Sequence, residues 1–103
     1  MKLEEIRFIA HNSVIKAHQI KPGMRVLESY GPNGETFIYL IENVYSSGRE
    51  VTFEGSTTVR MRGETKRISN SWRMHANSEL KVFFETIERA LELGIKEKDI
   101  ETS

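Results

Sequence analysis

The chain contains no cysteine among its 103 residues. This excludes disulfide bonds, a thiolate nucleophile and zinc ligation by sulfur, and it favours an intracellular protein. Long apolar segments are also lacking, because the longest run, residues 37–41, is far shorter than the roughly 20 residues that cross a bilayer. The first residues carry two glutamates and no extended apolar core. We therefore expect no signal peptide and a cytoplasmic protein without membrane contact.

Net charge is absent as well, since 15 basic residues balance 15 acidic ones. This balance excludes a protein that coats nucleic acid by its overall charge, so any anion binding must come from a local patch. The apolar fraction of 38% and the charged fraction of 29% are typical of a soluble globular chain. We expect one domain over residues 1–103, with the polar residues 97–103 as a frayed tail.

The sequence lacks motifs that carry a reaction. It has no GxxxxGK[ST] phosphate loop, no GxGxxG, no HExxH and no GxSxG. Its three histidines, His11, His18 and His75, lack the spacing that presents two ligands to one metal ion. The prediction is a protein that is not an enzyme and that uses no metal and no cofactor.

Turn signals and β-prone runs alternate through the first half of the chain. Strands are predicted at residues 13–20, 24–30, 35–45 and 50–54, separated by turns at 21–23, 31–34 and 46–49. Residues 1–10 fit a short helix and a strand equally well. Turns that recur about every ten to fifteen residues are typical of an antiparallel meander or a small barrel.

The last third of the chain has helical periodicity. Five apolar residues follow the i, i+3, i+4, i+7 pattern: Leu80, Phe83, Phe84, Ile87 and Leu91. We predict an amphipathic helix that Asn77 or Ser78 caps and Gly94 ends. Val82 and Leu93 lie off this apolar stripe, which suggests a second contact surface and a homo-oligomer.

These elements predict an α+β fold. Five or six antiparallel strands would form a curved sheet or a small, partly closed barrel, and the C-terminal amphipathic helix would cover one face or end.

One stretch, residues 51–75, concentrates positive charge. It holds five basic residues and the single tryptophan, Trp72, but only two acids, Glu54 and Glu64. Its charge is therefore +3, and the rest of the chain carries −3. The basic residues are Arg60, Arg62, Lys66, Arg67 and Arg73.

This stretch reads as a β-hairpin. Residues 57–62 and 65–69 would be its strands, and Gly63-Glu64 would form a two-residue type II′ turn. That register places Arg60 directly opposite Arg67, which is a destabilising like-charge pair. Two explanations stay open: a bound anion between the guanidiniums, or neutralisation by Glu54 or Glu64.

The functional prediction is a small binding protein for a phosphate-bearing ligand, either a nucleotide or a short nucleic acid. Arg60, Arg62 and Arg67 would contact phosphate, Arg73 would lie at the margin, and Trp72 would stack on a base. A core position for Trp72 is the other interpretation. The alternative function is a protein–protein inhibitor or adaptor, such as an accessory protein of a phage or mobile element, whose basic face docks on a host protein.

Overall fold

The computed structural model describes residues 11–30 and 35–102 of the chain. Within this part, seven strands form one antiparallel sheet: β1 (His11–Lys16), β2 (Arg25–Tyr30), β3 (Glu35–Ser47), β4 (Glu50–Met61), β5 (Glu64–His75), β6 (Glu79–Phe84) and β7 (Glu101–Thr102). The helical segments are short: two 3₁₀ turns, η1 (Ala17–Gln19) and η2 (Glu97–Asp99), and one α-helix, α2 (Ile87–Glu92).

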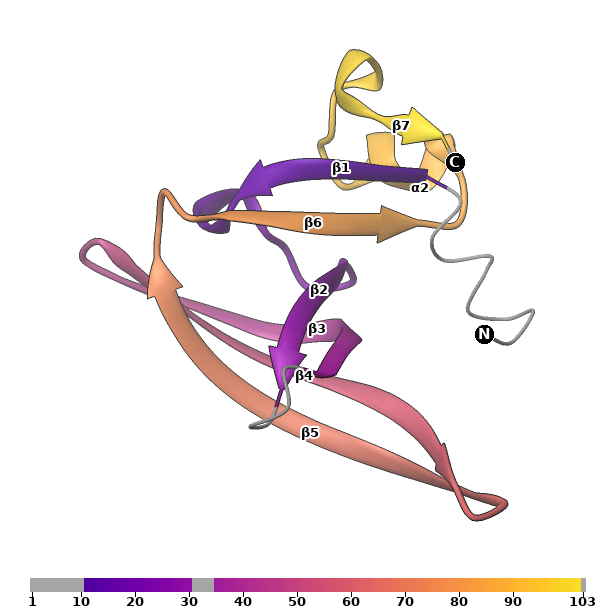
Figure 1. Ribbon diagram of the computed structural model, residues 1–103. Helices are drawn as coiled ribbons and strands as arrows, with labels where there is room; N and C mark the ends of the chain where they lie inside the picture. The colour runs from indigo at the N-terminus through magenta and orange to yellow at the C-terminus, as the bar shows by residue number, and fades with distance from the viewer. Residues whose placement is uncertain (1–10, 31–34, 103) are drawn as a thin grey trace.

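The sheet is open, with the strand order β5-β4-β3-β2-β6-β1-β7 (Figure 1). The prediction of an antiparallel sheet with a C-terminal helix is confirmed, and the protein is mostly β. The partly closed barrel is wrong, and so is the count of five or six strands, because residues 79–84 and 101–102 add β6 and β7. Among the described residues, two pairs, Arg25 with Phe83 and Val26 with Val82, join β2 to β6. The edge strands β5 and β7 do not pair with each other in this order, so the sheet does not close.

The core lies on one face of the sheet, which we call the inner face. Tyr39 on β3, Phe53 on β4, and Val26 and Val82 at the β2–β6 junction are fully buried there. Successive side chains of a strand point to opposite faces, so the neighbours of these residues belong to the outer face. In β4, for example, Val51, Phe53 and Gly55 are buried, whereas Thr52 and Glu54 between them are only half-buried.

Residues 79–84 form strand β6, and the prediction that they begin a helix is wrong. Leu80, Val82 and Phe84 alternate inward and are buried, while Glu79 and Lys81 are exposed. Val82 is fully buried, although helical spacing left it off the apolar stripe. The run is rich in valine and phenylalanine, and pairing with β1 and β2 outweighs the helical pattern.

The helix that does form, α2, begins after Thr86 rather than after Asn77 or Ser78. The Thr86 hydroxyl accepts a hydrogen bond from the Arg89 backbone N–H at 3.1 Å. Gly94 follows the helix with φ of 93°, so its predicted role as the stop is confirmed. Leu91 is 45% exposed and does not join the core, contrary to the prediction.

Of the other predicted segments, the turns within the described residues are confirmed and the frayed tail is wrong. The turn at 21–23 is present, with Gly23 at φ of 97°, and so is the turn around Gly48. Residues 97–102, predicted as a frayed tail, form η2 and β7, and Thr102 pairs with His11. Residues 1–10 and the predicted turn at 31–34 lie outside the described residues.

A β-bulge in β3 lies next to a close contact with β4. The pairing shifts between Ile41 and Asn43, which leaves Glu42 as the extra residue on an exposed position. Opposite Ile41, Gly55 is buried, and a Cβ atom at Gly55 would lie 2.8 Å from the Leu40 carbonyl oxygen. Only glycine allows the two backbones to approach this closely.

Replacing Gly55 with alanine should therefore destabilise the protein by about 1–3 kcal/mol, because β3 must shift away from the new methyl group. Urea denaturation measures this change. Thr58→Ala, an exposed position on the same strand, is the control and should stay within about 0.5 kcal/mol of wild type. Equal stabilities of the two variants would contradict the close approach.

Candidate functional site

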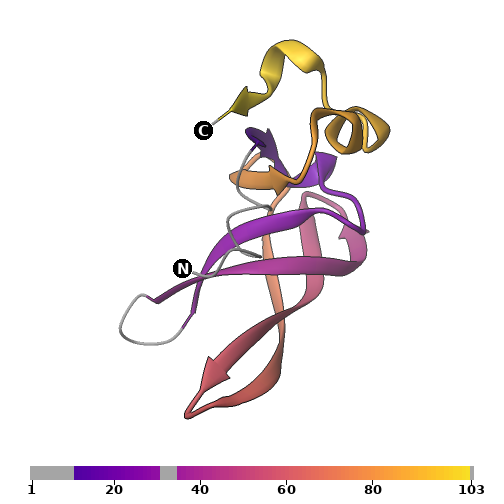
Figure 2. The same ribbon diagram turned by 90° about the vertical axis from the view of Figure 1, so that its right-hand side faces the viewer.

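The end of the β4–β5 hairpin projects from the sheet as a two-stranded arm. β3 pairs with β4 only as far as Ser56, and beyond that point β4 pairs with β5 alone. We call residues 57–68 the arm. Its tip lies at the end of the molecule opposite α2 and β7 in both views (Figures 1 and 2). The molecular extents of 39 × 30 × 21 Å reflect this elongation.

The register of the arm differs from the predicted one. Arg60 lies opposite Thr65 and Thr58 lies opposite Arg67, so the predicted pairing of Arg60 with Arg67 is wrong. The two-residue turn is Arg62-Gly63 rather than Gly63-Glu64. Moving the turn by one residue changes each partner by two positions, so Arg60 and Arg67 still lie on the same face of the hairpin. The two arginines are diagonal neighbours on the outer face and do not confront each other directly.

The turn places an arginine in an unusual backbone conformation. Arg62 has φ of 52° and Gly63 has φ of 80°, the signature of a type I′ turn, where type II′ was predicted. Asparagine, aspartate or glycine is preferred at the first of these positions, whereas arginine is strained there. Strain of this kind often marks a functional position.

The arm carries a net charge of +3, from Arg60, Arg62, Lys66 and Arg67 against Glu64. Arg60 and Arg67 share the outer face and Lys66 lies on the inner face opposite Val59. Among the described residues, Arg60, Arg62 and Lys66 make no ion pair. Three cations are thus available at the tip.

Arg67 is neutralised by a residue that the sequence did not single out. Its Nη2 donates to Glu42, the bulge residue of β3. In one of the two explanations that the sequence leaves open, Glu54 or Glu64 neutralises the arginine pair, but the ion pair of Arg67 forms with Glu42 instead. No local pattern around Glu42 indicates this contact, because it depends on the bulge that turns Glu42 outward.

Arg73 and Trp72 lie away from the arm. Arg73 Nε is 3.2 Å from Glu50 Oε2. Trp72 occupies the inner face, with its ring centroid 5.4 Å from that of Tyr39 and 5.6 Å from that of Phe53. The structure therefore brings together Arg60, Arg62 and Arg67 but not Trp72 and Arg73.

The outer face behind the arm has charges of both signs. Tyr45 is 55% exposed there, and a hydrogen bond to Glu54, together with the negative charge of that carboxylate, raises the pKa of its hydroxyl. Glu42 pairs with Arg67 and Glu50 pairs with Arg73, whereas Glu54 interacts with Tyr45. Among the described residues, the arginines of the outer face that lack an ion pair therefore lie toward the tip of the arm.

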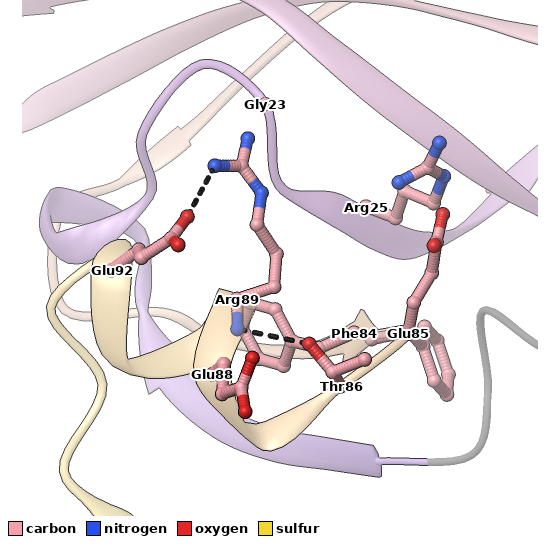
Figure 3. Close-up of a pocket in the computed structure, with 9 residues that line it drawn as sticks. Gly23, Arg25, Phe84, Glu85, Thr86, Glu88, Arg89 and Glu92 are labelled. Carbon is pink, nitrogen blue, oxygen red and sulfur yellow. Dashed lines mark hydrogen bonds and ion pairs between the residues drawn. The ribbon is translucent and has the colours of Figure 1, made fainter.

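A second feature is a pocket of about 280 Å³ between β2, the end of β6 and α2 (Figure 3). Arg25 and Arg89 line it together with three glutamates, Glu85, Glu88 and Glu92. Arg89 Nη1 is 3.1 Å from Glu92 Oε2. Because its carboxylates outnumber its guanidiniums, the pocket does not suit a phosphate.

Within this pocket, burial lowers the pKa of the Arg25 guanidinium. The Glu85 carboxylate opposes that change, and the positive charge of Arg89 adds to it. The Thr86 hydroxyl already serves as the cap of α2, so it is not placed as a nucleophile.

Comparison of the chain with protein-family models, with curated proteins and with solved structures finds no match. In the described part of the chain, no group of three histidine or acidic side chains is placed to hold a metal ion. None of the helices described there has the length and apolar character to span a membrane.

Arg62→Asn should stabilise the fold, because it relieves the backbone strain that arginine has at this position of the turn. Asparagine accepts the left-handed conformation, so we expect a gain of about 1 kcal/mol and a Tm increase of about 4–8 °C. Thermal unfolding measures this. Arg60→Asn, in the strand beside the turn, is the control and should not stabilise; a Tm decrease in Arg62→Asn would show that the turn is not strained.

Proposed function

We propose that the protein binds nucleic acid, without catalysis, by placing the arm against the phosphodiester backbone. The observation that carries this proposal is the set of cations at the tip, Arg60, Arg62 and Lys66, which have no ion-pair partner among the described residues. Guanidinium and ammonium groups form charge-assisted hydrogen bonds with phosphate oxygens. Strain at Arg62 supports the same interpretation, because a more stable residue would serve if only the turn mattered.

The shape of the arm favours a polymer over a free nucleotide. A nucleotide-binding site encloses its ligand in a concavity, whereas the arm is a projecting ribbon of two strands. The major groove of duplex DNA is about 12 Å wide and admits such a ribbon. A nucleic acid also presents successive phosphates, which match cations spread over both faces of the arm.

Recognition by this arm is independent of base sequence. The Trp72 ring packs against Tyr39 and Phe53, so it is not available to stack on a base. Phosphate contacts orient a protein on nucleic acid but do not read its sequence. Arg67 would add a fourth contact once it leaves Glu42, and Arg73 takes no part.

Replacing the three tip cations should weaken binding strongly and reduce its salt dependence. In Arg60→Gln/Arg62→Gln/Lys66→Gln, the slope of log K against log salt should fall by about 2.7, since each lost duplex phosphate contact contributes about 0.9. Fluorescence anisotropy with a labelled duplex at several salt concentrations measures this.

The matched control for this variant is Arg49→Gln/Lys96→Gln/Lys98→Gln. It removes the same charge from the β3–β4 turn and the η2 region, and it should bind like wild type. Equal losses in both triple variants would mean that overall charge, and not the arm, drives binding.

Releasing Arg67 should strengthen binding. In Glu42→Gln the carboxylate that holds Arg67 is gone, so the salt slope should steepen by about 0.9 for duplex DNA. Stability should change by less than about 1 kcal/mol, because both side chains lie on the surface, with exposed fractions of 62% for Arg67 and 39% for Glu42. Unchanged binding in this variant would remove Arg67 from the interface.

An acidic protein surface is the alternative partner for the same tip. The observation in its favour is that Val14, Leu27, Tyr45 and Leu91 are large, apolar and exposed in the described structure, as at protein interfaces. Affinity capture from lysate with and without nuclease separates the two functions. A stoichiometric protein partner that survives nuclease treatment would favour an inhibitor or adaptor.

A further inference from the structure

The outer edge of β5 is a long template for another strand. β5 spans Glu64–His75, and in the described sheet it pairs only with β4. Exposed edges are normally blocked by proline, bulges or covering segments. Residues 64–75 contain no proline, and the β4–β5 register runs through 12 successive pairs without a shift. The other edge of the sheet, β7, is only 2 residues long.

The middle of β5 has the symmetry that pairing with a copy of itself requires. Residues 67–73 read Arg-Ile-Ser-Asn-Ser-Trp-Arg, which is the same pattern in both directions about Asn70. A two-fold axis at Asn70 would set Ser69 opposite the second copy's Ser71 and Ile68 opposite its Trp72. Interfaces of two-fold dimers are self-complementary in this way. We propose that two copies of the chain pair through β5, antiparallel, about Asn70.

The two end residues of this stretch, Arg67 and Arg73, do not prevent a second copy from pairing. Arg67 would face the second copy's Arg73, and like charges directly opposite destabilise a sheet. Each of these arginines is already neutralised within its own chain, Arg67 by Glu42 and Arg73 by Glu50. The two ion pairs remove the repulsion that would otherwise oppose the register.

The backbone at the centre of β5 is oriented for this pairing. The Ser71 N–H donates to its own neighbour's side chain, Asn70 Oδ1, at 2.9 Å. This local bond indicates that the Ser71 N–H points to the open edge, and Ser69 shares its orientation by the two-residue period of a strand. Asn70 then forms a pair without backbone hydrogen bonds to its copy, which is the closer kind of pair.

Pairing would also cover apolar surface. Ile68, Trp72 and Met74 are half-buried on the inner face along the open edge. A second β5 would place its own Trp72 and Ile68 beside them and continue one sheet through both copies. The two arms would point in opposite directions from the shared axis.

Light scattering coupled to size exclusion tests the dimer on nucleic-acid-free protein. Wild type should have twice the 11.9 kDa mass of one chain. Ser71→Pro removes the edge N–H but no bond to β4, so its mass should fall to that of one chain. A wild-type protein that is monomeric at every soluble concentration would overturn the proposal, as would a Ser71→Pro variant that stays dimeric.

Cross-linking tests the register even if Ser71→Pro fails to fold. The chain has no cysteine, so Asn70→Cys introduces one thiol, which would meet its copy with Cβ atoms about 4.5–5.5 Å apart. Mild oxidation should link this variant into a covalent dimer. Ser71→Cys is the control, because its thiols would be diagonal neighbours about 7–8 Å apart and should stay reduced. Linking of Ser71→Cys but not of Asn70→Cys would overturn the register.

Discussion

The hydrogen-bonded ladder between β4 and β5 sets the position of the arm, of its charges and of the aromatic side chains beside it. Its 12 pairs run without a shift from Glu50–His75 to the Arg62-Gly63 turn. The ladder decides that Arg60 faces Thr65, that Trp72 faces Phe53 on the inner side, and that β5 is left as an edge. Because side chains alternate between faces, one turn fixes the position of the arm's charges and of the core aromatics together.

Electrostatics then divide the hairpin into a neutral base and a cationic tip. The bulge in β3, which the close approach at Gly55 permits, turns Glu42 toward Arg67, and Glu50 holds Arg73. Exposed ion pairs add little to stability, so their main effect is on the charge that a partner meets. Near the base, each outer-face arginine has a carboxylate. At the tip, Arg60 and Arg62 have none among the described residues.

Sequence patterns predicted the strands between residues 24 and 75 well and the periodic C-terminal segment poorly. The predicted strand 13–20 is only partly correct, because residues 17–19 form η1. The glycines at 23, 48 and 94 mark real turns because their φ values are positive. Residues 80–84 fit a helical stripe, but the buried Val82 between Leu80 and Phe84 follows strand alternation, and sheet pairing decided the outcome. Both Arg62-Gly63 and Gly63-Glu64 can form a two-residue turn, so local residues could not settle the register. Glu42 meets Arg67 across β4, a contact that no local pattern contains.

The most direct test is to map which residues of the protein contact nucleic acid. Titrating ¹⁵N-labelled protein with a short duplex, and following each backbone amide by NMR, locates that contact. The account predicts that the largest shifts fall at the tip, from Arg60 through Lys66, with little change at Arg25, Arg89 and the rest of the pocket. Shifts centred on the pocket, or no shifts at all at low salt, would contradict it.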